Sequence, residues 1–178
     1  MIATALDGSQ VFYRAHTPEW ASHPLSGAGA AKQGGRLNRQ GIHALYLADS
    51  AETAIAEYQQ LSPIMPPCTL VAYAVTVGSI VDFRGGYTPE HWSPLWQDLY
   101  CNWRKLALLD EIEPPSWILS DEVIAAGYAG VLFPSSTRTT GVNLVLYSDR
   151  LAATDSVVIH DPDGKLPQDR RSWSDRDR

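Results

Sequence analysis

The chain has 178 residues with 14 basic and 20 acidic side chains, which gives a formal net charge of −6. This length suits one domain with a sizeable core, and the acidic balance disfavours binding to nucleic acid or to an anionic membrane surface, both of which need a basic face. Residues 1–40 carry four basic and two acidic side chains, and residues 41–160 carry five basic and thirteen acidic ones. Residues 161–178 carry five of each kind. A local site for a small anion is therefore expected within the first forty residues.

Neither a membrane span nor a secretion signal is predicted. The longest apolar run, residues 70–75, is far shorter than the roughly 20 residues that span a bilayer, and the start of the chain lacks the basic region of a signal peptide. Cys68 and Cys101 have no neighbours at disulfide-framework or zinc-ligand spacing, and the five histidines form no metal-binding pair. We therefore expect two reduced thiols, a cytoplasmic protein and no metal site.

The apolar pattern predicts an α+β domain in which strands outnumber helices. In chain order, strands are expected at 11–14, 44–48, 69–77 with a continuation at 80–83, 130–134, 142–147 and 156–160. Helices are expected from an N-cap at Asp49 to about Gln60, from an N-cap at Thr88 through apolar spacing to Leu106, and from an N-cap at Ser120 to Gly127. Short, uneven connections favour antiparallel pairs over a doubly wound nucleotide-binding fold. We interpret residues 1–160 as a single domain and the highly charged residues 161–178 as a loose tail.

The first candidate for chemistry is the run Gly34-Gly35-Arg36-Leu37-Asn38, in a loop that is also rich in alanine and serine. Paired glycines let backbone N–H groups approach an anion, and an arginine supplies a bidentate donor for phosphate. The spacing matches neither a P-loop nor a dinucleotide fingerprint. An ordinary mobile surface loop is the alternative.

The second candidate is Glu57, on the helix that follows the strand bearing Tyr46. Glu57 shares a helical stripe with Ala54 and Tyr58, so its carboxylate lies either at a solvated edge or within the fold. A held carboxylate near an arginine can stabilise a developing cation, as glycosyl-transfer chemistry requires.

Two further segments have a structural and a functional interpretation. The hydroxyl-rich run from Ser135 to Arg138, before Asn143, either binds a ligand or forms a simple turn. The Trp-rich run at 89–108 is interpreted as core with one aromatic edge at an interface, and base stacking is disfavoured by the acidic surroundings.

Taken in order, these segments resemble the RES-domain family, the toxins of bacterial toxin–antitoxin pairs. The resemblance extends to about residue 150. It rests on the order of these segments along the chain and not on any one segment. Leu37 departs from the family's pattern, which usually has Trp after the Gly-Gly-Arg arginine, and we expect this to change packing beneath the loop rather than chemistry. The segments that carry the resemblance are 13–14, 26–30, 34–38, 44–50, 53–57, 130–135 and 141–147.

The resemblance implies a fold similar to that of ADP-ribosyltransferase toxins, with mixed, largely antiparallel sheets and flanking helices. It also implies NAD⁺ as the substrate and no metal. Arg36 would hold the NAD⁺ phosphates, Tyr46 would pack against the nicotinamide ribose or ring, and Glu57 would be the catalytic carboxylate. The other residues implied to bind NAD⁺ are Arg14, Gly35, Asn38, Ser135 and Asn143.

The resulting hypothesis is a growth-inhibiting toxin that cleaves the nicotinamide–ribose bond of NAD⁺ and transfers ADP-ribose to a protein target, with the segment 89–117 as the platform for that target. One alternative is an NAD⁺ glycohydrolase or phosphorylase that depletes cellular NAD⁺. A second alternative is a non-catalytic NAD⁺-binding or interaction module. As partner, the resemblance implies a helix-turn-helix antitoxin of the Xre type whose C-terminal part blocks the pocket, and it is compatible with a homodimer within that complex.

Overall fold

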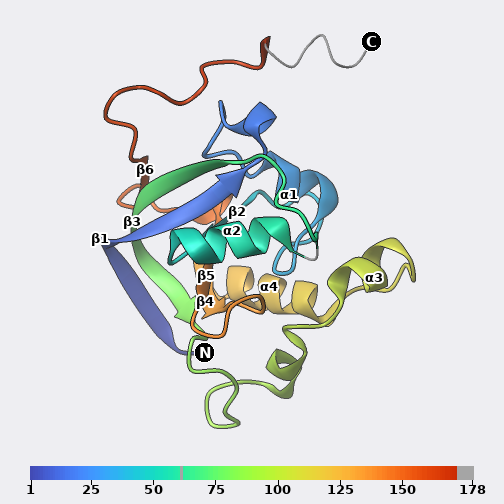
Figure 1. The fold of residues 1–178 in the computed structure, drawn as a ribbon. Coiled ribbons are helices and arrows are strands. Elements are labelled where there is room, and N and C mark those ends of the chain that lie inside the picture. The colour runs from blue at the N-terminus through green and yellow to red at the C-terminus, as the bar shows by residue number, and fades with distance from the viewer. Residues whose placement is uncertain (61, 172–178) are drawn as a thin grey trace.

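A six-stranded sheet forms the centre of the molecule (Figure 1). The computed structural model describes residues 1–60 and 62–171. The strands are β1 (Ala3–His16), β2 (Ala44–Ala48), β3 (Thr69–Asp82), β4 (Gly130–Pro134), β5 (Val142–Tyr147) and β6 (Ser156–Ile159). The helices are α1 (Ala28–Gln33), α2 (Ala51–Gln59), α3 (Trp103–Leu108) and α4 (Pro115–Ala125), and the 3₁₀ turns are η1 (Pro18–Trp20), η2 (Pro94–Asp98) and η3 (Ser148–Arg150).

The strand order is β1-β2-β5-β4-β3-β6, and β1 also pairs with β3 along most of its length. The pairs β1–β2, β1–β3, β2–β5, β4–β5 and β3–β6 are antiparallel, and only the short β3–β4 contact is parallel. Because β1 is bonded to both β2 and β3, five strands close on themselves and β6 extends the other edge of β3. The predicted α+β fold with largely antiparallel pairing and flanking helices is confirmed.

Strand alternation divides the core between the two faces of the sheet. On β4, Leu132 packs into a cluster enclosed by the curved strands, whereas its neighbours Val131 and Phe133 face the opposite side. On β5, Leu144 and Val145 divide in the same way. The outer cluster is covered by η2 and α4, and α2 packs against β1, β2 and β3. In Figure 1, α2 lies across the front of the curved strands, and α4 lies beside it.

The predicted strands are all present. β1 is much longer than expected, because it begins at residue 3 rather than 11. β3 joins the predicted run 69–77 and its continuation at 80–83 into one strand through Gly78. The helix after β2 is also present, but its N-cap is Ser50 and not Asp49, because the Ser50 hydroxyl accepts the Thr53 N–H at 3.1 Å.

The two other helix predictions need correction. Instead of one helix from Thr88 to Leu106, the chain forms turns, the 3₁₀ turn η2 and the separate helix α3, whose N-cap Asn102 accepts the Lys105 N–H. The helix expected to have its N-cap at Ser120 has it six residues earlier, at Pro114, and begins at Pro115. Ser120 lies inside α4, where its hydroxyl donates to the Trp117 carbonyl at 2.7 Å.

Residues 161–171, the part of the predicted tail that the structure describes, arch outward from the end of β6 (Figure 1). Leu166 packs against the enclosed cluster, and Arg170 pairs with Glu19 and lies over the ring of Trp20. Residues 172–178 of the predicted tail lie outside the described residues. Among the described residues, no helix is both long and apolar enough to cross a bilayer.

Candidate active site

The Gly-Gly-Arg loop is a tight, buried turn and not an open surface loop. The Gly35 N–H donates to the Asn38 carbonyl at 2.9 Å, which closes the turn around Arg36. The Asn38 side chain is fully buried, and its amide nitrogen donates to the carbonyls of Ala30, Arg39 and Ile42 at 2.9–3.1 Å. Asn38 therefore acts as an internal brace that fixes the loop onto α1 and the segment before β2.

Tyr46 supports this loop from β2. Its hydroxyl donates to the Asn38 side-chain oxygen at 2.8 Å and accepts the Leu37 N–H at 3.0 Å. Burial raises the pKa of the Tyr46 hydroxyl well above its usual value, so the group stays protonated and keeps its donor. Both of its hydrogen bonds go to the loop, which gives Tyr46 a structural role beside any contact with a ligand.

The Arg36 guanidinium reaches away from this turn toward the segment after η2. Its Nη1 donates to the carbonyls of Leu99 and Cys101 at 3.1 and 3.2 Å, and its Cζ lies 5.4 Å from the centre of the Tyr100 ring. No carboxylate lies within ion-pair distance of Arg36 among residues 1–60 and 62–171. The charge is thus oriented by neutral groups and available for an anion.

The Glu57 carboxylate is half-buried and held by two neutral donors. Its Oε1 accepts the Ser135 hydroxyl and the Asn143 side-chain amide, each at 2.7 Å. The Ser135 hydroxyl is itself fixed, because it accepts the N–H groups of Thr137 and Arg138. Within the described chain no hydrogen bond to Oε2 is present, so one carboxylate oxygen is anchored and the other is available.

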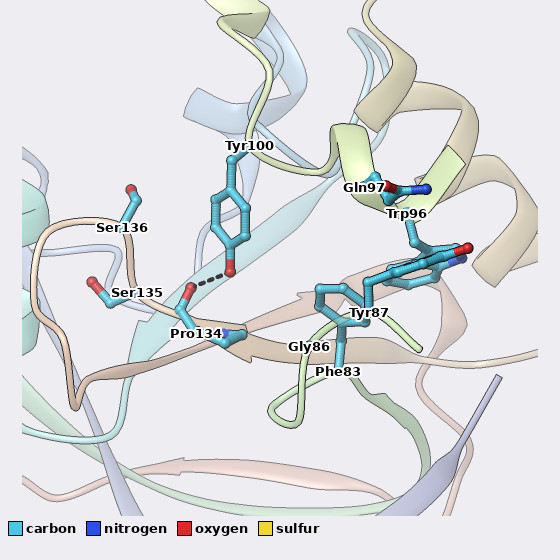
Figure 2. Close-up of a pocket in the computed structure, with 9 residues that line it drawn as sticks. All are labelled: Phe83, Gly86, Tyr87, Trp96, Gln97, Tyr100, Pro134, Ser135 and Ser136. Carbon is cyan, nitrogen blue, oxygen red and sulfur yellow. Dashed lines mark hydrogen bonds between the residues drawn. The ribbon is translucent and has the colours of Figure 1, made fainter. Parts of the chain in front are cut away.

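A pocket of about 460 Å³ opens beside this carboxylate, between η2 and the turn after β4 (Figure 2). Tyr100 forms one wall, and its hydroxyl donates to the Pro134 carbonyl at 2.8 Å. Burial raises the pKa of Tyr100 to about 12; the charge of Arg36 lowers it and that of Glu57 raises it further. Tyr100 therefore lies within electrostatic reach of both groups. The lining residues are Phe83, Gly86, Tyr87, Trp96, Gln97, Tyr100, Pro134, Ser135 and Ser136.

Arg14 lies apart from this network on β1. Its Nη1 donates to the Ser26 carbonyl at 3.3 Å, and burial lowers the pKa of its guanidinium. Burial and the charge of Arg14 together lower the pKa of the neighbouring His16 to about 3, so that ring is neutral at pH 7 and bonds the Tyr73 hydroxyl at 2.7 Å. The hydrogen bonds of the described residues do not connect Arg14 to Arg36, Tyr46 or Glu57.

The family is decided by comparison of the sequence with family models. The model of the RES domain matches residues 11–169. The chain belongs to the RES-domain family. Among curated proteins, no sequence matches this chain.

The RES fold is also found in a solved structure. This chain is similar to a chain in the crystal structure of the MbcT–MbcA toxin–antitoxin complex of M. tuberculosis, with a TM-score of 0.58 and 20% identity. The match covers 88% of this chain and 84% of that one. At this identity the likeness establishes the fold.

The RES domain brings most of the predicted residues together in two connected groups. Gly35, Arg36, Asn38 and Tyr46 form the braced loop, and Glu57, Ser135 and Asn143 form the carboxylate network. Tyr100 lies between the two groups, because it packs on Arg36 and bonds the residue before Ser135. No group of three or more His, Cys, Asp or Glu side chains in the described part of the chain is placed to hold a metal ion.

Two aromatic residues of the site are absent from the sequence-based prediction. The indole N–H of Trp117 on α4 donates to the Gly35 carbonyl at 2.7 Å, so α4 holds the loop from the opposite side. Tyr100 contacts Arg36 from the segment after η2. Leu37, which occupies the usual Trp position, is fully buried in the outer core cluster.

The positive charge of the first forty residues is partly neutralised by the fold. Arg39 pairs with Glu113 at 2.8 Å and with Asp121, and its Nε donates to Asp121 at 3.1 Å. Arg39 therefore links the loop to α4, and its charge is not available to bind an anion. Arg36, whose guanidinium packs on the pocket residue Tyr100, keeps its charge unpaired among the described residues.

Replacement of Tyr46 by Phe is expected to destabilise the protein by about 1–3 kcal/mol, because the Leu37 N–H and the Asn38 oxygen both lose their partner in a buried turn. Urea unfolding followed by fluorescence measures the change. The matched control is Tyr128→Phe, a partly buried tyrosine of the same core cluster. Equal destabilisation by both substitutions would contradict the bracing role of Tyr46.

Proposed function

We propose that this RES domain cleaves the bond between nicotinamide and ribose in NAD⁺ and transfers the ADP-ribose to an acceptor, and that it acts as the toxin of a toxin–antitoxin pair. The observation that carries the proposal is the Glu57 carboxylate, anchored through one oxygen by Ser135 and Asn143 beside an aromatic pocket. A fixed anion stabilises positive charge that develops on a bound substrate without the cost of reorienting solvent.

The proposed reaction follows from the charges of the substrate. The C1′–N bond breaks and its electron pair leaves with the nicotinamide nitrogen, so the ring departs neutral and a cation develops at the ribose carbon. The acceptor forms a new bond to that carbon and gives up its proton. Glu57 would stabilise the ribose cation with its available oxygen, as carboxylates do in glycosyl transfer.

Arg36 would hold the diphosphate of NAD⁺. The guanidinium is oriented by two backbone carbonyls and has no carboxylate partner among the described residues, so a phosphate oxygen can bind its remaining N–H groups. In a protein with a net charge of −6, such a local cation is needed before a dinucleotide can bind. Asn38, Gly35 and Tyr46 would position this arginine, whereas Arg14 lies apart from it on β1 and bonds the Ser26 carbonyl.

The toxin role rests on the family and on the similar toxin–antitoxin structure. For this chain we propose an antitoxin of the helix-turn-helix type that covers the pocket, in a complex formed in the cytoplasm. Tyr100, which forms one wall of the pocket, is 42% exposed, so a partner that covers the pocket could contact it.

We propose a protein as the acceptor of ADP-ribose, because exposed apolar side chains mark the segment that follows the pocket residue Tyr100 in the chain. Leu108, Leu109 and Ile112 are 54%, 77% and 55% exposed on the part of the chain that projects around α3 (Figure 1). Exposed apolar clusters of this kind are typical of protein contact sites. Water and inorganic phosphate are the alternative acceptors, and they would make the protein an NAD⁺-depleting enzyme.

The test is nicotinamide release by the purified protein from NAD⁺. We expect release by the parent, and an increase in KM of roughly 10–100-fold in Arg36→Ala, because a charge-assisted hydrogen bond to phosphate contributes about 1.5–3 kcal/mol. The control is Lys32→Ala, which removes an exposed cation from the same basic segment. Absence of release, or equal kinetics in Arg36→Ala, would contradict the proposal.

The acceptor is identified from the product. ADP-ribose on a protein in a cell extract supports transfer to protein, free ADP-ribose indicates hydrolysis, and ADP-ribose 1″-phosphate indicates phosphorolysis. Tight NAD⁺ binding with no release of nicotinamide would favour the non-catalytic module instead.

A further inference from the structure

The surface that follows α3 combines exposed apolar side chains with negative charge. Within the described residues, five large apolar side chains are more than half exposed, and three of them are Leu108, Leu109 and Ile112. The other two lie in separate segments of the chain. Single exposed apolar side chains are ordinary on a protein surface, whereas a group of them marks a contact site. We call residues 108–113 the α3 turn.

The backbone of the α3 turn is fixed by hydrogen bonds. The Ile112 N–H donates to the Leu106 carbonyl at 2.8 Å, and the Leu109 N–H donates to the Lys105 carbonyl at 3.0 Å. Glu111 has a φ of 54°, a left-handed conformation that residues other than glycine seldom adopt. Apolar side chains on a backbone that is already ordered lose little conformational entropy when a partner binds.

The charge around the α3 turn is of one sign. Residues 106–122 carry five acidic side chains and no basic one. Lys105 and Arg39 form ion pairs with three of the five. Glu111, in the α3 turn itself, is exposed and has no ion-pair partner in the part of the chain that the structure describes. This surface therefore complements a partner that has positive charge beside its own apolar side chains.

We propose that the α3 turn docks a basic amphipathic helix of the protein that accepts ADP-ribose; the inference rests on the proposed function. Such a helix sets its apolar face against the leucines and isoleucine of the turn and a lysine or arginine against Glu111. A second copy of this chain fits less well, because a symmetric contact places the same unpaired carboxylate on both sides. The acidic charge likewise disfavours nucleic acid and anionic lipid.

The α3 turn belongs to the same segment as the wall of the pocket. Tyr100 lines the pocket, and the Cys101 carbonyl accepts an N–H of Arg36 at 3.2 Å. Helix α3 begins at Trp103 and, with the chain that follows it, projects from the body beside α4 (Figure 1). A partner docked on the α3 turn is thereby held on the segment that also lines the pocket, which raises the effective concentration of its acceptor group.

The test uses a synthetic amphipathic helix of leucine and lysine as the probe and measures its binding to the full chain by calorimetry. The parent is expected to bind this peptide, and binding should weaken as salt is raised, because part of it is electrostatic. A helix of the same pattern with glutamate in place of lysine should not bind. A peptide of leucine and lysine in scrambled order, which has no apolar face, should bind at least about tenfold more weakly.

Two substitutions locate the binding on the α3 turn. Leu109→Ala is expected to weaken binding by about fivefold or more, as truncation of a central apolar contact does. Glu111→Gln should weaken it by about two- to fivefold at low salt and not at high salt. The matched control is Ile64→Ala, because Ile64 is 77% exposed, as Leu109 is, and lies between α2 and β3. It should leave binding unchanged, and thermal unfolding establishes that all variants are folded.

The outcomes separate the docking surface from the reaction. Equal binding by the parent and Leu109→Ala, or equal binding of the glutamate peptide, overturns the assignment. Dimerisation that rises with protein concentration and is abolished by Leu109→Ala would assign the surface to a second copy and overturns it as well. Peptide binding that depends on Leu109, in a parent protein that does not cleave NAD⁺, supports the surface while the proposed reaction fails.

Discussion

Replacement of Glu57 by Gln is expected to lower the rate of nicotinamide release by at least about 10²–10³-fold, because a fixed charge next to a developing cation is lost. The substitution preserves shape, and the amide oxygen of Gln can still accept the Ser135 hydroxyl and the Asn143 amide. The free energy of unfolding should therefore change little. We expect the loss in kcat, with the Kd for NAD⁺ nearly unchanged, since the phosphate contacts of Arg36 are untouched.

The matched control lies on the same helix. Glu52→Gln removes an identical charge from an exposed position in the first turn of α2, and should cost no more than roughly 0.3–1 kcal/mol of helix stability. Single-turnover release of nicotinamide, measured beside NAD⁺ binding by calorimetry, distinguishes the two variants. Retention of a third or more of the parental rate by Glu57→Gln would remove this carboxylate from the mechanism.

The strands were predictable because their pattern has a local cause. On β4 and β5 alternate residues pack into the two clusters on opposite faces, and both faces are buried, which gives the nearly continuous apolar runs seen in the sequence. The extra length of β1 was not predictable in this way. Its first part, from Ala3 to Asp7, has one buried residue, Leu6, and is held by pairing with β3, whose partner residues lie about 70–80 positions away in sequence.

The single helix predicted after Thr88 shows the limit of spacing arguments. Trp92, Trp96, Leu99 and Trp103 recur every three or four residues and are all buried, as a helix would require. Successive turns and a 3₁₀ segment produce the same recurrence, and Pro94 and Asn102 start new elements within the run. Apolar spacing identified the buried side chains correctly but not the backbone that carries them.

In the candidate site, too, the residues with a local sequence signal could be predicted, and those held by long-range contacts could not. The loop with Arg36 and the helix with Glu57 could be proposed from the sequence, because a glycine pair beside arginine and a carboxylate on an apolar helix are local signals whose order along the chain joins them. Tyr100 and Trp117 could not, because their contacts to Arg36 and Gly35 join segments more than 60 residues apart. No local signal distinguishes them from the other aromatic residues of that run.

Replacement of Gly35 by Ala is expected to disrupt the loop that holds Arg36. A Cβ at this position would overlap the Asn38 side-chain oxygen and would lie 2.6 Å from the Tyr46 hydroxyl. Neither group can move aside cheaply, because Asn38 is fully buried with three hydrogen bonds from its amide and Tyr46 is bonded to the same turn. Overpacking of this kind costs about 1–3 kcal/mol, and a shift of Arg36 by about 1 Å can lower activity by roughly 10²-fold.

Gly29→Ala provides the contrast within the same glycine-rich segment. Gly29 lies in α1, where a Cβ would meet no atom within 4 Å, so alanine should be accepted there and stabilise the protein by about 0.4–1 kcal/mol. Thermal unfolding and NAD⁺ cleavage of both variants measure the difference. If Gly35→Ala unfolded and reacted like Gly29→Ala, the loop would not need its close approach to Asn38 and Tyr46. If Gly35→Ala loses activity and Gly29→Ala does not, the glycine at position 35 is required. The absence of a side chain there would then be what allows Tyr46 and Asn38 to hold the loop that carries Arg36.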